Sequence, residues 1–420
     1  MNYSFSEKVS HLQASAIREI LKFTADPSVI SFAAGNPAPE AFPVADVQRI
    51  AQEMFAEEPI NVLQYGITEG YTPLRDTMKA RMQAAGNFKP ETEDLIMTSG
   101  AQQVMELACK SLCDPGDTLI AEAPSFIGSL NAFKSYNVNL VGVPLDDEGM
   151  DPEKLEEALK ANPNTKLIYL IPNFQNPTGK TTTLRRRKEL YSLAQKYNTT
   201  ILEDNPYGDL RFAGEDVPSI KSLDTDGRVI YAGSFSKVLS PGIRVGFAIA
   251  QKDVISKMVV CKQVSDVHTN NFGQMLAYRF MQSVDFDAHL AGLRAIYKQK
   301  AERMMNGMEA HFSKKVSFTR PEGGLFLWCT LPEGSDMMGF CTRAVAENKI
   351  AVVPGSAFMI SEQDVTYSFR MNYSTPTDAA IDKGVEILGS ALSRDQISFE
   401  LPPEKALFAL RTLHALCFER

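Results

Sequence analysis

Strand-like and helix-like segments alternate through the middle of this 420-residue chain, and that alternation limits the fold more than any other feature. Short apolar segments of strand length occur at residues 94–98, 118–122, 138–144, 166–171, 200–203, 228–232 and 245–250. Segments with helical spacing separate several of them. The fourth segment, Lys-Leu-Ile-Tyr-Leu-Ile, is apolar almost throughout, as expected of a strand that is covered on both faces. The pattern predicts an α/β fold with a mainly parallel, seven-stranded sheet between helices.

The pattern changes after about residue 284, where a smaller unit begins. Helices are predicted at residues 286–312, 338–348 and 378–393. Short antiparallel strands are predicted at residues 318, 326–328, 350–353 and 367–373. We therefore expect a large domain at 55–285 and a small α+β domain built from both chain ends, at 1–54 and 286–395. No role is predicted for the tail at 396–420.

Composition argues against several classes of protein. The net charge is −8, from 43 Lys and Arg against 51 Asp and Glu, and the absence of a basic block argues against a nucleic-acid partner. No uncharged apolar run approaches the ~18 residues that a membrane helix needs, so we expect no membrane partner. The N-terminus lacks the apolar core of a secretory signal. The cysteines form no CxxC pair and the histidines are scattered, so we expect no metal site and a reducing, cytoplasmic location.

Residues just after the predicted strands carry the candidate chemistry, because ligands of open α/β sheets bind at the carboxyl ends of strands. Ser99, Gly100, Ala101 and Gln102 follow the first strand and lead into a helix. Small residues at a helix N-terminus leave N–H groups available for an anion. The same residues also suit an ordinary strand–helix turn.

Three later strand ends supply polar side chains. The turn after the fourth strand carries Asn176, and the turn after the fifth carries Asp204 and Tyr207. A carboxylate at a buried strand end is costly without a cationic partner, whereas in a solvated turn or a helix cap it is ordinary. Lys237 follows the sixth strand and precedes an apolar Val-Leu pair. An amine in such a place tends to have a lowered pKa and can act as a nucleophile, although a surface lysine is the alternative.

Together these groups match one type of ligand. A phosphorylated aromatic aldehyde with a ring nitrogen would use all of them. The groups are an anion cradle, an amide, an acid with a phenol three residues on, and a lysine with Arg244 seven residues later. The lysine would form a Schiff base with the aldehyde, and the acid would pair with the ring nitrogen. The cradle and the arginine would bind the phosphate.

The motifs resemble those of the class I/II aminotransferases, which are fold-type I enzymes of pyridoxal 5′-phosphate (PLP). The resemblance covers about residues 15–392 and is carried by Asn176-Pro177-Thr178-Gly179, Asp204-Asn205-Pro206-Tyr207, Ser234-Phe235-Ser236-Lys237 with Pro241-Gly242-Ile243-Arg244, and Ser368-Phe369-Arg370. It is greatest to the 2-aminoadipate/kynurenine aminotransferase branch. The marks of that branch here are Ile17-Arg18-Glu19, Ser31-Phe32-Ala33-Ala34-Gly35-Asn36-Pro37, Gln64-Tyr65-Gly66 with Glu69-Gly70, and Phe174-Gln175-Asn176-Pro177.

The resemblance implies cofactor-binding roles for the matching positions. It implies that Lys237 binds PLP covalently as a Schiff base and that Asp204 pairs with the ring nitrogen. Asn176 and Tyr207 are expected to contact the ring 3-oxygen, and Phe126 to stack on the ring. Phosphate contacts are implied for Ser99, Gly100, Ala101, Gln102, Ser234, Ser236 and Arg244.

The resemblance also implies how substrate and a second subunit are bound. Arg370 is expected to bind the substrate carboxylate, with Gly35 and Asn176 beside it. The alternation of aromatic and polar residues along 367–373 supports a structured position for Arg370, although it could also point into water. Tyr65 is expected to reach the phosphate of a neighbouring subunit, which implies a homodimer with shared active sites. Arg18 either meets an acidic substrate side chain or is a surface arginine.

The implied activity is transfer of an amino group from an L-amino acid to a 2-oxo acid in ping-pong order, with 2-oxoglutarate as the expected acceptor. Two alternatives are a PLP-dependent β-lyase on the same fold and the non-catalytic PLP-binding effector domain of a transcription regulator. The donor amino acid stays open among aromatic, 2-aminoadipate, branched-chain and lysine-related substrates. Ala34, Asn36 and Asn205-Pro206 depart from the family's pattern near the substrate, which weakens any inference about specificity.

Overall fold

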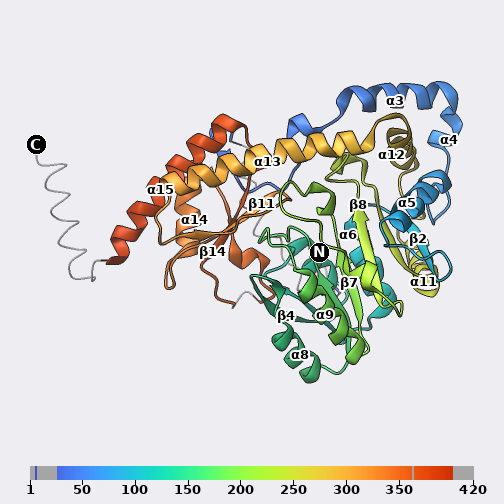
Figure 1. Cartoon of the computed structure of the whole chain (residues 1–420), viewed down its shortest axis with the longest axis horizontal. Helices are drawn as coiled ribbons and strands as arrows, with labels where there is room; N and C mark the ends of the chain where they lie inside the picture. The colour runs from blue at the N-terminus through green and yellow to red at the C-terminus, as the bar shows by residue number, and fades with distance from the viewer. Residues whose placement is uncertain (1–4, 7–25, 362–363, 401–420) are drawn as a thin grey trace, which may run out of the picture.

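The central sheet has the predicted α/β architecture. The computed structural model describes residues 5–6, 26–361 and 364–400, the segment 394–400 as backbone only. Eight strands form the sheet in the order β2-β9-β8-β7-β6-β3-β4-β5 (Figure 1). Their bounds are β2 Glu93–Thr98, β3 Thr118–Ala123, β4 Asn139–Asp146, β5 Gly149–Met150, β6 Thr165–Leu170, β7 Thr200–Asp204, β8 Val229–Ser234 and β9 Gly246–Gln251. The two-residue strand β5 adds to the seven predicted ones.

Strand direction brings the candidate residues to one edge. Strands β8, β7, β6, β3 and β4 are parallel, and β9 is antiparallel to both of its neighbours, β2 and β8. Strand β2 therefore runs in the same direction as β8. The carboxyl ends of β2, β3, β6, β7 and β8 thus open at the same edge, and β9 begins there.

Helices cover both faces of the sheet. They are α5 Thr72–Ala84, α6 Ala101–Leu112, α7 Ile127–Lys134, α8 Pro152–Ala161, α9 Leu184–Lys196, α10 Ile220–Leu223, α11 Lys252–Gln263 and α12 Asn271–Ser283. On β6, Ile168 and Leu170 belong to the apolar cluster with α8 and α9, whereas Leu167 and Tyr169 belong to the larger core on the α6 side. Side chains of a strand alternate between faces, so the apolar run at 166–171 is covered on both faces as predicted.

The second lobe has a small antiparallel sheet in the order β10-β11-β14-β13. Its strands are β10 Ser317–Phe318, β11 Phe326–Thr330, β13 Val353–Pro354 and β14 Ser368–Asn372. The long helix α13, Phe286–His311, runs across the upper side of Figure 1 and packs against α15, Asp378–Glu400. Helix α14, Met337–Ala346, completes this lobe.

One strand prediction is wrong. The segment 350–353 was expected to be one antiparallel strand, but it divides into β12, Ile350–Ala351, and β13. Strand β12 pairs in parallel with β1, Ile30–Ser31, because the N-terminal segment enters beside it, whereas β13 pairs with β14. This crossing places residues 32–36 next to β14, where the backbone N–H of Asn372 donates to Phe32 O. The boundaries of the two domains stay a prediction.

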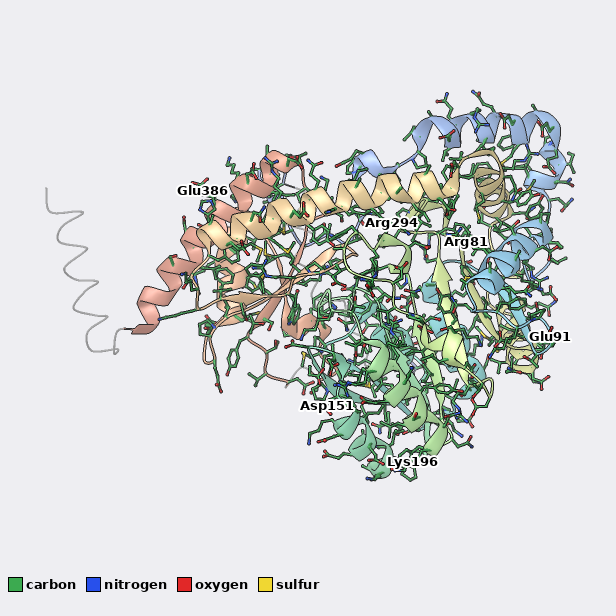
Figure 2. All side chains as sticks on the ribbon, in the orientation of Figure 1. Arg81, Glu91, Asp151, Lys196, Arg294 and Glu386 are labelled. Atoms are coloured by element: carbon green, nitrogen blue, oxygen red, sulfur yellow. The ribbon has the colours of Figure 1, made fainter. Side chains whose placement is uncertain are left out.

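The remaining N-terminal helices lie on the outside. Helices α3, Val44–Glu57, and α4, Pro59–Leu63, follow the short 3₁₀ helix η1, Pro39–Ala41 (Figure 1). Charged side chains such as Glu91, Lys196 and Glu386 project from the rim of the molecule in Figure 2. Among the helices that the structure describes, none combines the length and the apolar character needed to cross a membrane.

Candidate active site

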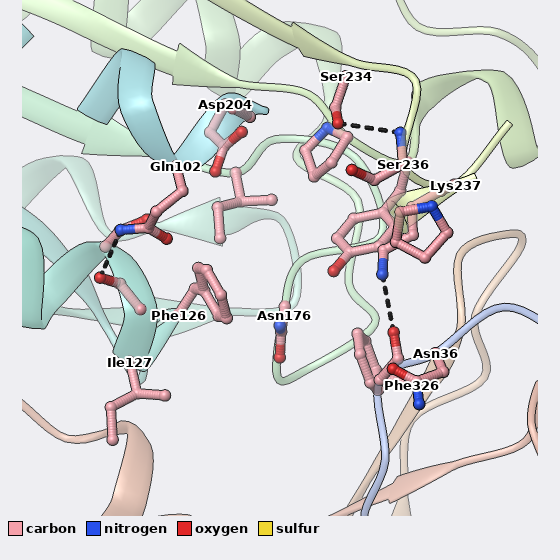
Figure 3. Close-up of a pocket in the computed structure, with 18 of the residues that line it drawn as sticks. Asn36, Gln102, Phe126, Ile127, Asn176, Asp204, Ser234, Ser236, Lys237 and Phe326 are labelled. Atoms are coloured by element: carbon pink, nitrogen blue, oxygen red, sulfur yellow. Dashed lines mark hydrogen bonds between the residues drawn. The ribbon is translucent and has the colours of Figure 1, made fainter. Parts of the chain in front are cut away.

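Most of the predicted site residues line a single cavity of about 450 Å³ between the sheet edge and the second lobe (Figure 3). The predicted residues that line it are Gly35, Ala101, Gln102, Phe126, Asn176, Asp204, Tyr207, Ser234, Ser236, Lys237, Arg244 and Arg370. They come from segments up to 335 positions apart in the chain. The cavity is thus assembled by strand topology and by the crossing of the N-terminal segment.

Three predicted residues are described by the structure but do not line this cavity. Ser99 and Gly100 lie below the cavity wall, where the Ser99 carbonyl accepts a hydrogen bond from Arg244 Nη2 at 3.1 Å. Tyr65 is 81% exposed, and its ring packs edge-on against His268 at 5.7 Å. Arg18 falls outside the described residues. The proposed reach of Tyr65 into a partner's site stays a prediction.

The N-terminus of α6 forms an anion cradle. Gly100 caps the helix with a φ of 79°, and its side-chain-free backbone lets the Arg244 guanidinium approach, since a Cβ there would collide with it. No side chain caps this helix end. The first-turn N–H groups of Ala101 and Gln102 therefore face a site that Ser234, Ser236 and Arg244 also line. Arg244 itself adopts a left-handed backbone with a φ of 53°, a conformation that costs energy in a non-glycine residue and often marks a functional site.

A buried network supports this cradle from beneath. The amine of Lys262, which is fully buried, lies 2.8 Å from Asp266 Oδ1 and donates to Gln103 Oε1 at 2.6 Å. Asp266 Oδ2 accepts a 2.8 Å bond from the Ser99 hydroxyl, and Gln103 Oε1 accepts from the Ser99 N–H. Ser99 is thus held by hydrogen bonds at its N–H, hydroxyl and carbonyl, which fixes the chain entering the cradle.

Lys237 is a buried amine without a counter-ion. Its Nζ donates to Gly35 O at 2.8 Å, the dashed bond at Lys237 in Figure 3, and no described carboxylate pairs with it. Burial, with smaller contributions from the positive charges of Arg370 and Arg244, lowers the pKa of Lys237 to about 8. With this pKa, roughly a tenth of the amine is neutral at pH 7, and that neutral form can act as a nucleophile.

Asp204 has one satisfied oxygen and one open oxygen. Its Oδ2 accepts a 2.8 Å hydrogen bond from the Tyr169 hydroxyl, while the buried Oδ1 has no partner in the described part of the chain. Burial raises the pKa of Asp204 to about 7. A buried unpaired oxygen at a cavity wall calls for an N–H donor from a ligand. The protonated ring nitrogen of PLP is such a donor, so this observation fits the predicted cofactor.

Arg370 is a second buried cation without a carboxylate. It is 4% exposed; Nη1 donates to Asn176 Oδ1 and Nη2 to Ala33 O, both at 2.8 Å, and Nε has no partner. Its guanidinium lies 4.2 Å from the ring centroid of Phe326 and 4.8 Å from that of Phe358. Burial lowers the pKa of Arg370 to about 10. An unpaired arginine with a fixed fork suits a ligand carboxylate.

Sequence reasoning missed several residues of this site. Phe326 lines the cavity and also packs edge-on against Tyr207 at 5.9 Å. Ser129 lines the cavity, and Tyr169 contacts Asp204 from β6. Phe326 opens a predicted strand and Tyr169 lies in the continuous apolar run at 166–171, a sequence pattern that indicates strand positions only. Nothing in that pattern indicates which core aromatic touches a polar group.

Comparisons with known proteins agree with these features. Residues 27–388 match the family model described as Aminotransferase class I and II. Aromatic-amino-acid aminotransferase 1 of Thermococcus litoralis is 40% identical over 395 residues, covering 93% of this chain and 94% of the relative. The 2-aminoadipate transaminase of Thermus thermophilus is 38% identical over 392 residues, covering 93% and 96%. The solved structure of Pyrococcus horikoshii kynurenine aminotransferase, in complex with PMP, KYN as substrates and KYA as products, is 38% identical, with a TM-score of 0.89 and coverage of 93% and 97%.

Proposed function

Because the chain belongs to the class I and II aminotransferases, which are PLP-dependent enzymes, we propose that its cavity moves the amino group of an L-amino acid to 2-oxoglutarate in ping-pong order. One observation carries the proposal. Three groups line the same cavity. They are the Lys237 amine, which can lose its proton, Asp204 Oδ1, which accepts no hydrogen bond from the described residues, and the Arg370 guanidinium, which has no described carboxylate partner. These are the groups needed to hold an aldehyde, a ring nitrogen and a carboxylate.

The described residues fit PLP at three points. Lys237 would hold its aldehyde carbon, Asp204 its ring nitrogen, and the cradle of Ala101 and Gln102 with Arg244 its phosphate. When bound, the cofactor supplies an electrophilic carbon and a ring that withdraws electrons from the amino-acid Cα. Phe126 would pack against the ring.

Asn176 and Tyr207 would contact the ring oxygen. Burial raises the pKa of Tyr207 above its usual range, so its phenol stays protonated and can donate a hydrogen bond. Asn176 is held in place by Arg370 through the 2.8 Å bond to its Oδ1. The Asn176 side chain also forms a hydrogen bond with Tyr207, so one amide hydrogen would remain for the ring oxygen.

Lys237 would transfer the substrate Cα proton after the amino group of the substrate has replaced it on the cofactor. Arg370 would bind the substrate carboxylate with two N–H groups, which orients the Cα–H bond toward the amine. The pKa of about 8 lets Lys237 Nζ accept the Cα proton and deliver a proton to the carbon that held the aldehyde. Asp204 keeps the proton on the ring nitrogen throughout. Hydrolysis by water would release the 2-oxo acid and leave the amino group with the cofactor, from which the acceptor would take it by the reverse sequence.

Aromatic amino acids and 2-aminoadipate are the donors we propose. Relatives at 38–40% identity carry these substrates in their names. The cavity wall offers apolar surface from Phe126, Ile127 and Phe326, which suits an aromatic or aliphatic side chain.

A homodimer with shared sites is also proposed. Several large apolar side chains are exposed on α3, α4, the following loop and the end of α11: Phe55, Ile60, Leu63, Tyr65, Ile67, Val260, Val264 and Val267. Exposed large apolar side chains gathered on these few elements favour a protein partner. A second copy covering it would bury Tyr65 near the partner's cradle. A cytoplasmic location stays a prediction.

A panel of amino acids incubated with the PLP-loaded protein and 2-oxoglutarate tests the function. We expect glutamate to form with aromatic amino acids or 2-aminoadipate, and the bound cofactor's visible absorption to change in a single turnover without acceptor. Release of pyruvate and ammonia without acceptor, and no glutamate from any donor, would instead establish a β-lyase.

A further inference from the structure

The Tyr169 hydroxyl joins Asp204 to Ser129 inside the protein. Tyr169 is fully buried on β6, with its oxygen 2.8 Å from Asp204 Oδ2 and 2.9 Å from Ser129 Oγ. Its ring packs edge-on against Phe133 at 5.2 Å, which fixes the direction of the hydroxyl. The proposed proton transfers use neither Tyr169 nor Ser129.

This hydroxyl is the one hydrogen-bond donor that Asp204 receives from the described residues, and no described Lys, Arg or His forms an ion pair with the carboxylate. The titratable and charged groups that surround Asp204 come from β3, β6, β8, the loop after β7, the segment after β8, and β14: Glu122, Tyr169, Tyr231, Tyr207, Lys237, Arg244 and Arg370. Glu122 is itself buried, and burial raises its pKa to about 8, so it adds little negative charge at neutral pH.

The order of protons along the chain follows from counting them. A phenol has one proton, so Tyr169 can donate to Asp204 or to Ser129 but not to both. An ionised Asp204 can only accept, so the phenol proton then lies toward Asp204 and the Ser129 hydroxyl donates to the phenol oxygen. When Asp204 is protonated, both bonds can reverse. The chain Ser129–Tyr169–Asp204 therefore keeps Asp204 Oδ2 and the Tyr169 oxygen hydrogen-bonded in both charge states.

Resting on the PLP-dependent function proposed above, we propose that Tyr169, supported by Ser129, is a positioning residue that orients the Asp204 carboxylate toward the cofactor ring and keeps it ionised there. The Tyr169 bond occupies Oδ2, which leaves Oδ1 to face the ring nitrogen. Without the phenol, Asp204 loses a donor to its charged form, and the proton shared with the ring nitrogen shifts toward the carboxylate. The ring then withdraws electrons less strongly.

Tyr169→Phe tests this inference in the PLP-loaded protein, because phenylalanine keeps the packing and removes only the hydroxyl. A hydrogen bond to a charged group is worth roughly ten-fold or more in an equilibrium constant. We expect the PLP dissociation constant to rise about ten-fold and kcat to fall about ten-fold, with KM for the amino donor nearly unchanged. The ¹⁵N chemical shift of labelled ring nitrogen, measured without substrate, should move toward the unprotonated value. Ser129→Ala should produce smaller changes in the same direction.

Tyr191→Phe is the matched control. Tyr191 is also a buried phenol bonded to a carboxylate, 2.9 Å from Asp226 Oδ1, but it lies on α9 away from the cavity. Its loss should leave the ¹⁵N shift and the PLP affinity unchanged. In an Asp204→Asn background, Tyr169→Phe should have little further effect on the ring nitrogen, since no carboxylate charge remains to be supported.

Two outcomes would overturn the inference. One is a ring-nitrogen shift in Tyr169→Phe equal to that of the wild type. The other is an equal effect of Tyr169→Phe in the wild-type and Asp204→Asn backgrounds, which would mean that the phenol acts through general packing. Failure of the proposed function is distinguishable, because it would appear as absence of transamination in the wild type itself.

Discussion

The same sheet contains two sets of buried charges, and they differ in whether their partners are present. One set, the back cluster, consists of Glu93, Glu203, Lys221 and Asp224. Lys221 is 1% exposed, and its amine lies 2.6 Å from Glu93 Oε1, 3.3 Å from Asp224 Oδ2 and 2.8 Å from Val229 O. The other set lines the cavity, where Lys237 has only a carbonyl partner.

Glu203 and Asp204 show the contrast within one strand. They are neighbours on β7, so their side chains point to opposite faces of the sheet. Glu203 accepts the N–H groups of Ile220 and Lys221 at 3.0 and 2.7 Å, one on each oxygen. Asp204 accepts a bond from Tyr169 on one oxygen, and its other oxygen has no partner among the described residues. Burial raises the pKa of both, so burial alone does not separate them.

The difference is that the charges of the back cluster face partners within the protein, whereas several charged groups of the cavity have no ionic partner among the described residues. The back cluster satisfies its charges internally and can contribute only to folding. The cavity residues leave one amine, one carboxylate oxygen and one guanidinium ready for a ligand. Substitutions in the two sets should therefore separate stability from catalysis.

The largest expected effect comes from substituting each of the two lysines, Lys237 and Lys221, in turn. Lys237→Ala should lower transamination by on the order of 1,000-fold, since it removes the covalent attachment and the proton carrier. Lys221→Met should instead reduce the free energy of unfolding by about 3–5 kcal/mol, because Glu93 and Asp224 would lose their cation. Steady-state kinetics and urea unfolding measure the two effects. A Lys221→Met enzyme that folds normally and has no activity would break the comparison.

The two acids on β7 should differ in the same way. Asp204→Asn should lower kcat on the order of 100-fold, whereas Glu203→Gln should mainly lower stability. The folded-state pKa of Asp204 is raised from 3.8 to about 7, so its ionisation costs stability progressively as the pH rises through that interval. The cofactor-free Asp204→Asn protein should therefore unfold at a higher temperature than the wild type at pH 8. A melting temperature of Asp204→Asn below that of the wild type at pH 8 would contradict a raised pKa of Asp204.

Arg370→Gln should raise KM for amino donors by about 10- to 100-fold, because a charge-assisted carboxylate contact is lost. The matched control is Arg211→Gln, since Arg211 already pairs with Glu322 at 2.7 Å. Its KM should match that of the wild type. Equal KM values for both variants would remove Arg370 from substrate binding.

A smaller effect concerns pH. In cofactor-free protein, the rate of PLP capture should rise with pH and level off above about 8, as Lys237 loses its proton. Arg370 lowers the pKa of this amine through its charge, so Arg370→Gln should move the midpoint to higher pH. Stopped-flow absorbance at a series of pH values measures it. A midpoint that stays fixed in the variant would show that the two cations are not coupled.

The smallest expected effect is that of Tyr65→Phe, which should raise the PLP dissociation constant a few-fold if Tyr65 reaches a partner's phosphate through one hydrogen bond. Mixing Tyr65→Ala protein, which would bind PLP more weakly, with inactive Lys237→Ala protein at limiting PLP gives a sharper test. Hybrid dimers with shared sites should regain part of the activity, because one of their two sites would carry neither substitution. No recovery on mixing would argue against shared sites.

Much of the site was predictable because each motif follows a strand in a parallel sheet. Asn176 and Lys237 follow β6 and β8, Asp204 is the last residue of β7, and their convergence requires only the strand order. The bonds that hold them were not predictable. Tyr169 and Glu203 each lie in an apolar strand pattern, and only the packed structure shows which polar atoms they meet. The division of residues 350–353 between two sheets depends on the N-terminal strand, which local sequence does not reveal.

Reductive trapping of the bound cofactor tests the central claim most directly. The PLP-loaded protein is treated with borohydride, digested, and analysed by mass spectrometry for the pyridoxyl-modified lysine. We expect the modification on Lys237, with Lys221, whose amine is paired with Glu93 and Asp224, unmodified. Modification of Lys221 or of another lysine in place of Lys237, or none in a protein that binds PLP, would contradict the account.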